Sequence, residues 1–584
     1  MANSLFRTKS ISNILAESEK GNTDAHKHSL HRVLTVRDLT FFGIAAILGA
    51  GSFSSLGGAV FHGGPGVVIL FVITAIACAF TAFCYSEFAS RIPVAGSAYT
   101  YAYASFGELF AWIIGWALIM EYSIGNIYVA YSWSDYFTSF LEKINIHLPQ
   151  YLCTSYLEVK HALADGSTNA EVLDAWNNAP MIGGLRMILD LPALIINILI
   201  TYLVFRGIKE SRNFSNVMVI LKMIVVTLVI LVGGYLVFSH GLTFNWHPAN
   251  DEGVKSFMPN GFGGVMAAVS GVFFAYIGFD AVSVLAEESK NPQRDLPRGM
   301  ILSLVICTIV YILLTLVLTG AVNYRNFEGV GDPLAFIFEK QNLNVGWMQF
   351  FVAIAAVIAM TSVLLVFQMG QPRIWMSMSR DGLLPPVFQK IHPKFKTPSF
   401  ATIVTGLVVG IPILFTDKTF VLDFTSIATL FAFVLVCGGV LLIPRREKEA
   451  GRFHIPYFNG QYLFPLIVVA AFATAMYLSK SYVADLFNFD FSGNKGYVSG
   501  KISYMDAATP NISLIIFWMS AILISVFAFI KKYSLIPLMG LITCMYLLTG
   551  MTMKNWAWFL SWLGVGLIFY FLYGYKKSKL AVKE

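Results

Sequence analysis

The chain has 584 residues, of which 57% are hydrophobic and 12% are charged, and its mean hydropathy is +0.67. A soluble chain of this length needs more charged residues to cover its surface, so the composition excludes a soluble globular protein and indicates a membrane protein. The net charge of +7 comes from basic residues scattered over short polar segments, and it does not indicate nucleic-acid binding.

The first 40 residues are polar and carry both signs of charge, unlike a signal peptide, and we expect them to form a cytoplasmic tail. The six cysteines have no spacing that predicts a disulfide framework or a metal site. No cofactor and no metal are therefore expected.

Fourteen apolar runs approach the roughly 20 residues that a helix needs to cross the hydrocarbon core. They lie at 41–59, 66–89, 108–140, 189–205, 214–238, 261–286, 299–322, 346–371, 399–416, 421–443, 462–479, 512–530, 534–551 and 555–574. Their length and uniform apolarity exclude barrel strands. The predicted fold class is an all-α polytopic membrane protein with about 14 transmembrane helices.

The distribution of lysine and arginine predicts the orientation of these helices. With the N-terminus inside, 28 of the 40 basic residues fall in cytoplasmic segments, 11 fall outside, and Lys222 lies in a span. Because basic residues accumulate in cytoplasmic loops, this asymmetry places both termini in the cytoplasm.

Two groups of five spans, at 41–238 and 261–444, are followed by four accessory spans at 462–575 and a cytoplasmic tail at 576–584. The longer polar loops near 142–188 and 480–511 fall outside the membrane in this topology. Neither loop is long or apolar enough to predict an independent domain, and their function cannot be read from the sequence.

The first span of each group contains a glycine-rich weak point. Gly49 and Gly51 stand among small residues in the first span, and Gly278 lies in the sixth. Glycine is a poor helix former, so these helices are expected to unwind there. Glycine-interrupted helices at matching positions of two halves point to a transporter site at the bilayer midplane. The alternative is that each glycine only allows close helix packing.

Four segments resemble one known family. They are Gly-Ala-Gly-Ser-Phe at 49–53, Cys-Tyr-Ser-Glu-Phe-Ala-Ser-Arg-Ile-Pro-Val-Ala-Gly-Ser-Ala-Tyr-Thr-Tyr at 84–101, Phe-Phe-Ala-Tyr-Ile-Gly-Phe-Asp-Ala-Val-Ser at 273–283 with the charged stretch 287–297 after it, and Met-Ser-Arg-Asp-Gly-Leu-Leu-Pro at 378–385. Together they resemble the amino acid–polyamine–organocation superfamily, and within it a bacterial-type member of the cationic amino acid transporter family.

The resemblance implies a five-plus-five inverted-repeat core with broken helices 1 and 6. It implies that backbone at Ile47, Ala50 and Gly51 binds the carboxylate of the substrate. It also implies a second set of backbone groups that binds the amino group, at Phe274, Ala275 and Ile277. Ser52 departs from the apolar residue that is usual in this family after the second glycine.

Lys222 lies inside the fifth span, eight residues or about 12 Å from its cytoplasmic start. One interpretation is that its long side chain reaches back to the interface. The other is proton coupling, because a desolvated lysine exchanges its proton more readily. Proton-coupled members of the superfamily carry a lysine in this context, so the resemblance favours the second interpretation.

Glu121 lies well inside the third span, where it either contacts the amino group or a cationic side chain of the substrate or supports the structure. Asp280 and Glu87 are interpreted as structural or gating residues. The aromatic residues Trp116, Tyr276 and Phe279 are weaker candidates for the wall of the cavity, because an aromatic residue in a membrane helix is more often packing.

The favoured function is secondary active transport of amino acids by proton symport. The substrates are cationic amino acids such as arginine and lysine, or small neutral ones. Amino acid exchange, polyamine transport and a non-transporting amino acid sensor remain alternatives. The chain has no hydrolase, zinc-protease or nucleotide-binding signature, so an enzyme or an ATP-driven pump is not expected.

The expected location is the plasma (inner) membrane, as an integral multi-pass protein. Its expected partners are the amino acid substrate, protons and the lipid bilayer, with no nucleic acid. A site built from backbone groups accepts any α-amino acid, so the accepted side chains, the choice between symport and exchange, the oligomeric state and the role of the last four helices do not follow from the sequence.

Overall fold

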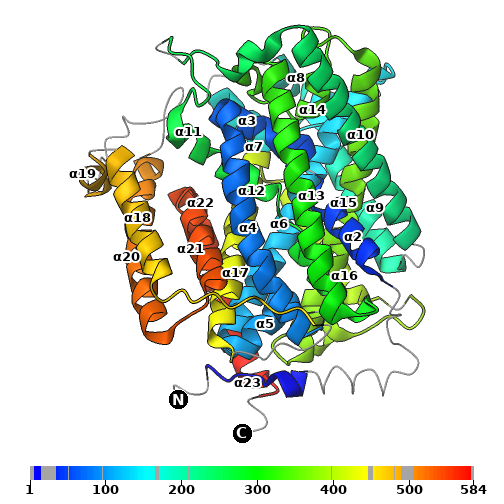
Figure 1. The fold of residues 1–584 in the computed structure, drawn as a ribbon. Coiled ribbons are helices and arrows are strands. Elements are labelled where there is room, and N and C mark those ends of the chain that lie inside the picture. Colours follow the sequence, from blue (N-terminus) through cyan, green and yellow to red (C-terminus); the bar gives the residue numbers. More distant parts are fainter. Residues whose placement is uncertain are drawn as a thin grey trace.

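The computed structural model describes residues 5–14, 34–49, 51–94, 96–164, 170–207, 211–250, 253–395, 397–444, 452–478, 481–487 and 504–580. Figure 1 shows long helices packed side by side, with α8 and α14 at one end and α5 and α23 at the other. We call the end that carries residues 5–14 and α23 the base of the molecule.

The first half of the chain contains α2 (Val36–Ile47), η2 (Gly51–Ser55), α3 (Leu56–Gly63), η3 (Gly64–Gly66), α4 (Val67–Arg91), α5 (Ser97–Ser105), α6 (Glu108–Lys143), η4 (Gln150–Leu152), α7 (Tyr156–Ala164), α8 (Ala170–Asn178), β1 (Met181–Ile182), β2 (Leu185–Arg186), α9 (Leu191–Arg206), α10 (Ser211–Ser239) and η5 (Leu242–Trp246). β1 and β2 form a short antiparallel hairpin. The positive φ angles of Gly183 and Gly184 close its turn, because glycine adopts such angles without strain.

The second half contains α11 (Gly261–Ala267), α12 (Val269–Phe274), η6 (Asp280–Glu288), α13 (Pro292–Ala321), η7 (Tyr324–Phe327), α14 (Pro333–Phe336), α15 (Gly346–Arg380), η8 (Pro386–Gln389), α16 (Ser399–Ile413), α17 (Lys418–Leu442), α18 (Leu463–Leu478), α19 (Tyr482–Phe487), α20 (Tyr504–Lys531), α21 (Leu535–Leu548), α22 (Met553–Phe569), η9 (Tyr570–Gly574) and α23 (Tyr575–Lys577).

Eight helical stretches of the described chain are long and apolar enough to cross a membrane, and the first of them, Val36–Arg91, holds two of the predicted spans. Four shorter apolar helices accompany them: Leu191–Arg206, Ser399–Ile413, Leu463–Tyr477 and Leu535–Leu548. The prediction of a helical, multi-pass membrane protein is confirmed.

Burial separates central from peripheral helices. The most apolar window of α6 is 89% buried inside the protein, whereas that of α20 is 17% buried. Figure 1 shows α18 and α20 at one side of the bundle, beyond α21 and α22. Because apolar side chains are equally at home in lipid, the outer helices keep their apolar residues exposed to it, while α6 lies in the packed centre.

Tryptophan indoles fasten α22 to α6. Trp116 Nε1 donates to the carbonyl of Trp562 at 2.9 Å, and Trp562 Nε1 donates to the carbonyl of Trp116 at 3.1 Å. Trp112 Nε1 donates to the carbonyl of Gly566 at 2.9 Å. A ring at position 116 fits because Gly566 has no side chain: a Cβ there would lie 2.4 Å from the Trp116 ring.

Both ends of the chain meet at the base. Lys9 forms an ion pair of 2.9 Å with Asp381, which follows α15, and the backbone N–H of Lys579 donates to the Asp381 carbonyl at 3.0 Å. The buried carboxylate of Glu108, the first residue of α6, accepts from Ser578 Oγ at 2.5 Å and from Tyr570 Oη at 3.1 Å.

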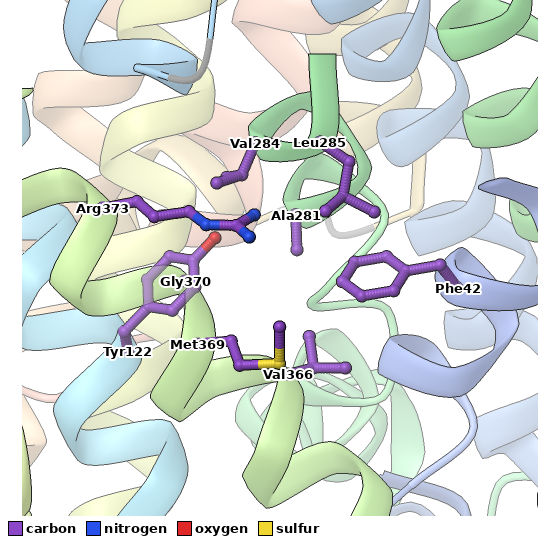
Figure 2. Close-up of a pocket in the computed structure, with 9 residues that line it drawn as sticks. All are labelled: Phe42, Tyr122, Ala281, Val284, Leu285, Val366, Met369, Gly370 and Arg373. Atoms are coloured by element: carbon purple, nitrogen blue, oxygen red, sulfur yellow. The ribbon is translucent and has the colours of Figure 1, made fainter. Parts of the chain in front are cut away.

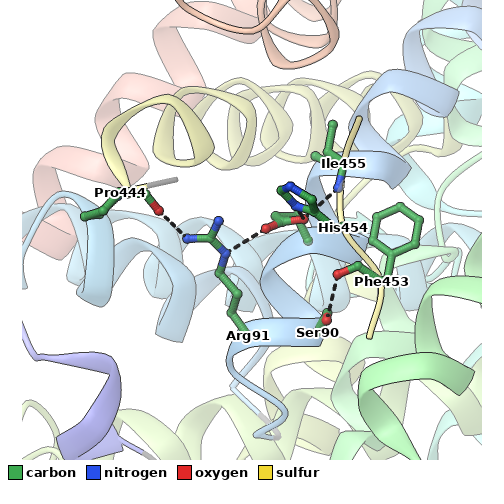
Figure 3. A network of polar contacts seen from close by, with 7 residues as sticks. Ser90, Arg91, Pro444, Phe453, His454 and Ile455 are labelled. Atoms are coloured by element: carbon green, nitrogen blue, oxygen red, sulfur yellow. Dashed lines mark hydrogen bonds and ion pairs between the residues drawn. The ribbon is translucent and has the colours of Figure 1, made fainter. Parts of the chain in front are cut away.

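The chain that follows α17 is tied to the base end of α4 (Figure 3). Glu87 accepts the backbone N–H of Ile455 at 2.8 Å and the Arg91 Nε–H at 2.7 Å, and His454 Nδ1 lies 3.4 Å from its second oxygen. Arg91 Nη1 donates to the carbonyl of Pro444 at 2.7 Å. Glu87, interpreted from the sequence as a structural or gating residue, thus connects α4 to the chain after α17.

Candidate functional site

The first interruption follows α2. The helix ends at Ile47, and the chain resumes at Gly51 as a single π-helical turn, η2, before α3 begins at Leu56. Single π turns within membrane helices are uncommon and are frequent at functional sites. The predicted interruption of the first span is therefore present, and residue 50 between the two pieces lies outside the described residues.

The second interruption follows α12, which ends at Phe274. Five residues form turns before the 3-10 segment η6 begins at Asp280, and Gly278 among them has a φ of +117°, which side-chain-bearing residues rarely adopt. The Gly278 N–H donates to Asp280 Oδ1 at 3.3 Å. The predicted interruption of the sixth span is also present.

The two interruptions lie against each other. A Cβ built on Gly51 would lie 2.4 Å from the Cα of Ala275, so the two backbones touch there. A Cβ on Gly278 would lie 2.7 Å from the Cβ of Ala46, so the second interruption also packs on the last turn of α2. Residues predicted to bind the two ends of a zwitterion are thus brought together from segments more than 220 positions apart.

Tyr311 on α13 joins the two interruptions. Its hydroxyl lies 2.7 Å from the Ile47 carbonyl and 2.7 Å from the Ala275 carbonyl, and its single proton can be donated to either. Tyr311 was not among the residues predicted from the sequence to form the site. A tyrosine in the apolar run 299–322 was the available signal, but its partners are 264 and 36 positions away, and no spacing rule connects them.

Lys222 on α10 reaches the first interruption. It is 1% exposed, and its Nζ donates to the carbonyls of Ala45 and Leu48, both at 3.0 Å. These carbonyls are released from the helical ladder where α2 ends. The side chain therefore does not extend to the interface in this structure, and it ties α10 to the end of α2.

Two serine hydroxyls within the first interruption lie within hydrogen-bond distance of backbone carbonyls. Ser52 Oγ donates to the Gly49 carbonyl at 3.0 Å, and Ser55 Oγ lies within hydrogen-bond distance of the Gly51 and Gly271 carbonyls. Ser55 thereby connects η2 to α12. Ser52 is polar where the resembling family usually has an apolar residue, and it is accommodated because its hydroxyl satisfies a neighbouring carbonyl.

Glu121 on α6 is 3% exposed, and its Oε2 has no hydrogen-bond partner among the described residues. Buried polar atoms are usually paired, so an orphaned carboxylate oxygen calls for a ligand, a proton or water. Glu121 is also near enough to Asp280 for the two carboxyl groups to interact electrostatically.

The remaining predicted residues take several positions. Phe274 packs edge-on against Tyr128, with ring centroids 4.6 Å apart, and the Ile277 N–H donates to the Phe274 carbonyl at 3.2 Å. Tyr276 donates its hydroxyl to the Phe71 carbonyl at 3.1 Å. The Phe279 ring meets Tyr85 edge-on, with centroids 6.0 Å apart, and lies tilted against Phe433 at 5.1 Å.

The interpretation of Trp116 as a cavity residue is wrong. Its ring stacks on Trp562 with centroids 4.9 Å apart, on the side of α6 that faces α22. The sequence signal, an aromatic residue five positions before Glu121, did not show which side of α6 it occupies.

Two interrupted helices that meet in a buried polar centre, inside a helical multi-pass bundle, are the arrangement of a secondary transporter. Comparison with known proteins agrees. The amino acid permease family model matches residues 34–484.

Several characterised proteins are similar over most of the chain. A branched-chain amino acid permease of Bacillus subtilis (strain 168) is 41% identical over 452 residues, 77% of this chain and 88% of the relative. A methylthioribose transporter of the same organism is 39% identical over 459 residues, covering 78% and 89%. Cationic amino acid transporter 1 of Arabidopsis thaliana is 30% identical over 574 residues, covering 95% and 85%. The chain belongs to the amino acid permease family, within the superfamily that its motifs resemble.

Proposed function

We propose that the protein is a secondary active transporter that carries amino acids across the plasma membrane together with protons. The observation that carries this proposal is the contact between Gly51 and Ala275, where the unwound ends of two helices offer backbone donors and acceptors side by side. An amino acid zwitterion needs both kinds of group at once, because its carboxylate accepts and its ammonium donates hydrogen bonds.

The architecture that fits this function has fourteen crossings and both termini in the cytoplasm. The core consists of inverted repeats at 41–238 and 261–444, and 462–575 forms the accessory helices. In support, the first proposed repeat opens with α2 and the second with α11 and α12, and an interruption follows both α2 and α12. Residues 5–14 and α23 also lie at the same end of the bundle.

In this proposal the carboxylate is bound by backbone at Ile47, Ala50 and Gly51, and the amino group by backbone at Phe274, Ala275 and Ile277. The Ile47 and Ala275 carbonyls both lie within hydrogen-bond distance of the Tyr311 hydroxyl. An ammonium that binds Ala275 therefore takes the place of the tyrosine proton, which couples substrate binding to the position of α13.

Proton coupling is assigned to Lys222. When protonated, its ammonium holds the carbonyls of Ala45 and Leu48, and when neutral it has two protons and no charge with which to hold them. The two protonation states therefore stabilise different positions of α2 relative to α10, which a coupled transporter requires.

The test is uptake by purified protein in liposomes, with a panel of labelled amino acids, a diamine and methylthioribose, with and without an inward proton gradient. We expect accumulation of amino acids that depends on the gradient. Uptake only against preloaded amino acid would identify an exchanger, and preference for the diamine or for methylthioribose would replace the proposed substrate class. Binding without any flux would indicate a sensor.

Gly51→Leu tests the location of the site. The leucine side chain forces the Gly51 and Ala275 backbones apart, so we expect substrate binding to be lost. Gly58→Leu is the matched control, because position 58 is exposed on α3 and nothing lies within 4 Å of its Cβ. Equal binding by the two variants would contradict the proposed location.

Glu121→Gln tests the role of the buried carboxylate. We expect weaker apparent affinity, with the largest loss for lysine or arginine, because the variant keeps the shape and removes the negative charge. Glu142→Gln, at the exposed far end of the same helix, is the control. Unchanged affinities for all substrates would leave Glu121 with a structural role.

A further inference from the structure

An ion pair lies at the end of the bundle opposite the base, which we call the far end. It joins Asp135, near the end of α6, to Lys418, the first residue of α17. The segment between η7 and α14 packs on the same carboxylate: a Cβ on Gly331 would lie 2.8 Å from Asp135 Oδ2. Three parts of the chain that are distant in sequence therefore meet around this ion pair.

The Lys418 cation also lies over an aromatic ring. Its Nζ is 5.6 Å from the centroid of the Tyr128 ring, within the range of a cation–π interaction. Tyr128 and Asp135 are seven positions apart on α6, so they share one face of the helix about 10 Å apart along its axis. Lys418 contacts both, and Glu158 on α7 attracts the same cation electrostatically.

The Tyr128 ring in turn covers both interruptions. Its hydroxyl lies 3.4 Å from Ser54 Oγ in η2, and its ring packs edge-on against Phe274 at the end of α12. Ser54 is three positions after Gly51, and Phe274 directly precedes Ala275. The ring therefore spans the two segments whose backbones meet at the proposed zwitterion site.

Exposure falls from the ion pair inward. The side chains of Asp135 and Lys418 are 32% and 16% exposed, whereas Tyr128 is 2% exposed and Phe274 and Ser54 are buried. A molecule that approaches the site from the far end along these contacts meets the ion pair first and the Tyr128 ring second. Both layers consist of side chains, which can change rotamer without unfolding a helix.

We infer that Lys418, Asp135 and Tyr128 form the gate of the substrate site at the far end, which is the external side in the proposed topology. The ion pair keeps the cation over Tyr128 and so holds the ring on Ser54 and Phe274. When the ion pair separates, the ring is free to turn away and admit substrate. Because the ion pair is partly exposed, water can replace its contacts, which keeps opening reversible. The inference rests on the proposed transport function.

A cysteine placed beneath the gate tests it. Ser54→Cys puts a thiol where Tyr128 covers the first interruption, and Cys153→Ala removes the native cysteine that is not buried. Right-side-out vesicles from cells that express this full chain are treated with a membrane-impermeant methanethiosulfonate, and the rate of labelling is measured. The chain with Cys153→Ala alone gives the background.

A second reporter lies on the base side of the interruptions. Ala281 on η6 lines a small cavity whose other walls belong to α2, α6 and α15 (Figure 2). Segment η6 contacts α5 at the base, where Ser283 Oγ donates to Ser97 Oγ at 2.9 Å. Ala281→Cys, also combined with Cys153→Ala, is labelled in inside-out vesicles. It reports access from the base, which the proposed gate does not control.

Lys418→Met removes both the ion pair and the cation over the ring. We expect labelling of Ser54→Cys in right-side-out vesicles to become about tenfold faster, because two stabilising contacts of the closed gate are lost. Labelling of Ala281→Cys in inside-out vesicles should not rise. Lys418→Arg keeps the charge and the stacking on the ring, and it should restore most of the slow labelling of Ser54→Cys.

Two further variants make the result specific. Asp135→Asn should speed labelling of Ser54→Cys less than Lys418→Met does, because the cation keeps its place over Tyr128 and its attraction to Glu158. Lys160→Met is the matched control, since this lysine is exposed on α7, and it should change neither labelling rate.

The outcomes that would overturn the gate are distinct. Unchanged labelling of Ser54→Cys in Lys418→Met does so, and an equal rise at both reporters does so as well, because it shows a general loosening of the fold. Faster labelling of Ser54→Cys in inside-out than in right-side-out vesicles overturns the external assignment. Leucine uptake by the unmodified chain is measured in the same vesicles, and its absence would contradict the proposed transport function, whereas the labelling rates decide on the gate.

Discussion

The backbone groups of the two interruptions at the centre of the molecule find their hydrogen-bond partners in different ways. In the first, carbonyls at the end of α2 are held by side chains of two other helices, Lys222 on α10 and Tyr311 on α13. In the second, the chain after α12 is closed mainly by its own turns, with Gly278 at positive φ and Asp280 holding the Gly278 N–H. The first interruption therefore responds to a titratable side chain elsewhere in the bundle, whereas the second, apart from the shared Tyr311, is set mainly by its local backbone.

The largest effect on stability is expected at the second interruption, which is held mainly by its own turns. Gly278→Ala places a side chain at unfavourable φ, which costs of order 1–3 kcal/mol, and drives its Cβ into Ala46, which costs about 1–3 kcal/mol more. We expect loss of most folded protein, measured by monodisperse yield in detergent and by thermal unfolding.

Gly241→Ala separates the two causes. This glycine also has positive φ, at +66°, but no atom lies within 4 Å of its Cβ, so the control carries the backbone strain without the collision. Equal losses of stability in the two variants would mean that the contact with α2 contributes nothing.

The next effect concerns coupling at the first interruption. A gradient of one pH unit stores about 1.4 kcal/mol per proton, enough for about tenfold accumulation of a co-transported substrate. Lys222→Met should abolish this accumulation and reduce equilibrium binding less, because it removes the titrating group rather than the backbone site. Lys222→Arg should also fail to accumulate, since arginine stays protonated.

The control is Leu221→Met, at the neighbouring position, which is 37% exposed on the outer side of α10. It should accumulate substrate like the wild type. Full accumulation by Lys222→Met would mean that the lysine has only a structural role, and Glu121 would become the candidate for proton coupling.

Tyr311→Phe tests whether the link between the two interruptions matters for movement. The variant leaves the Ile47 and Ala275 carbonyls without this donor, at a cost of about 1–3 kcal/mol. Tyr131→Phe is matched, because the Tyr131 hydroxyl also lies near two carbonyls, those of Ile413 at 2.7 Å and Thr416 at 2.8 Å.

Both tyrosine variants should lower the unfolding temperature by similar amounts, and only Tyr311→Phe should change the rate of transport. If Tyr131→Phe slowed transport to the same degree, the effect would reflect general stability and not the link between the interruptions.

The smallest effect is expected from Ser52→Ala. It removes one hydrogen bond within the first interruption, from Ser52 Oγ to the Gly49 carbonyl, worth about 0.5–1.5 kcal/mol. Ser525→Ala removes a comparable bond, of 2.7 Å to the Ala521 carbonyl on α20. The unfolding temperature should fall slightly in both variants. A fall for Ser52→Ala as large as that for Gly278→Ala would mean that the first interruption depends on its own local contacts as strongly as the second does.

Features that depend on local composition could be predicted from the sequence. The apolar runs predicted the helices, and glycines among small residues predicted the interruptions. Lys222 was singled out because a charge in an apolar run is costly and needs a reason.

Features that depend on how the helices pack against one another could not be predicted from the sequence. Tyr311 binds carbonyls from two distant segments, and Trp116 faces α22, which is separated from it by more than 400 positions. The eighth run was predicted to end at 371, so Arg373 was counted with the cytoplasmic loop. Helix α15 instead continues through Pro372 to Arg380, and it carries the guanidinium into the bundle.

The contact between Glu108 and the end of the chain has a consequence for biosynthesis. Glu108 is made early, yet two of its hydroxyl donors, Tyr570 and Ser578, are 462 and 470 positions later. Until translation ends, the carboxylate at the start of the most buried helix lacks these partners. A nascent protein can thus have every span inserted while Glu108 still lacks its contact with Ser578, and a chain truncated after Lys577 should be recognised by quality-control proteases although no span is missing.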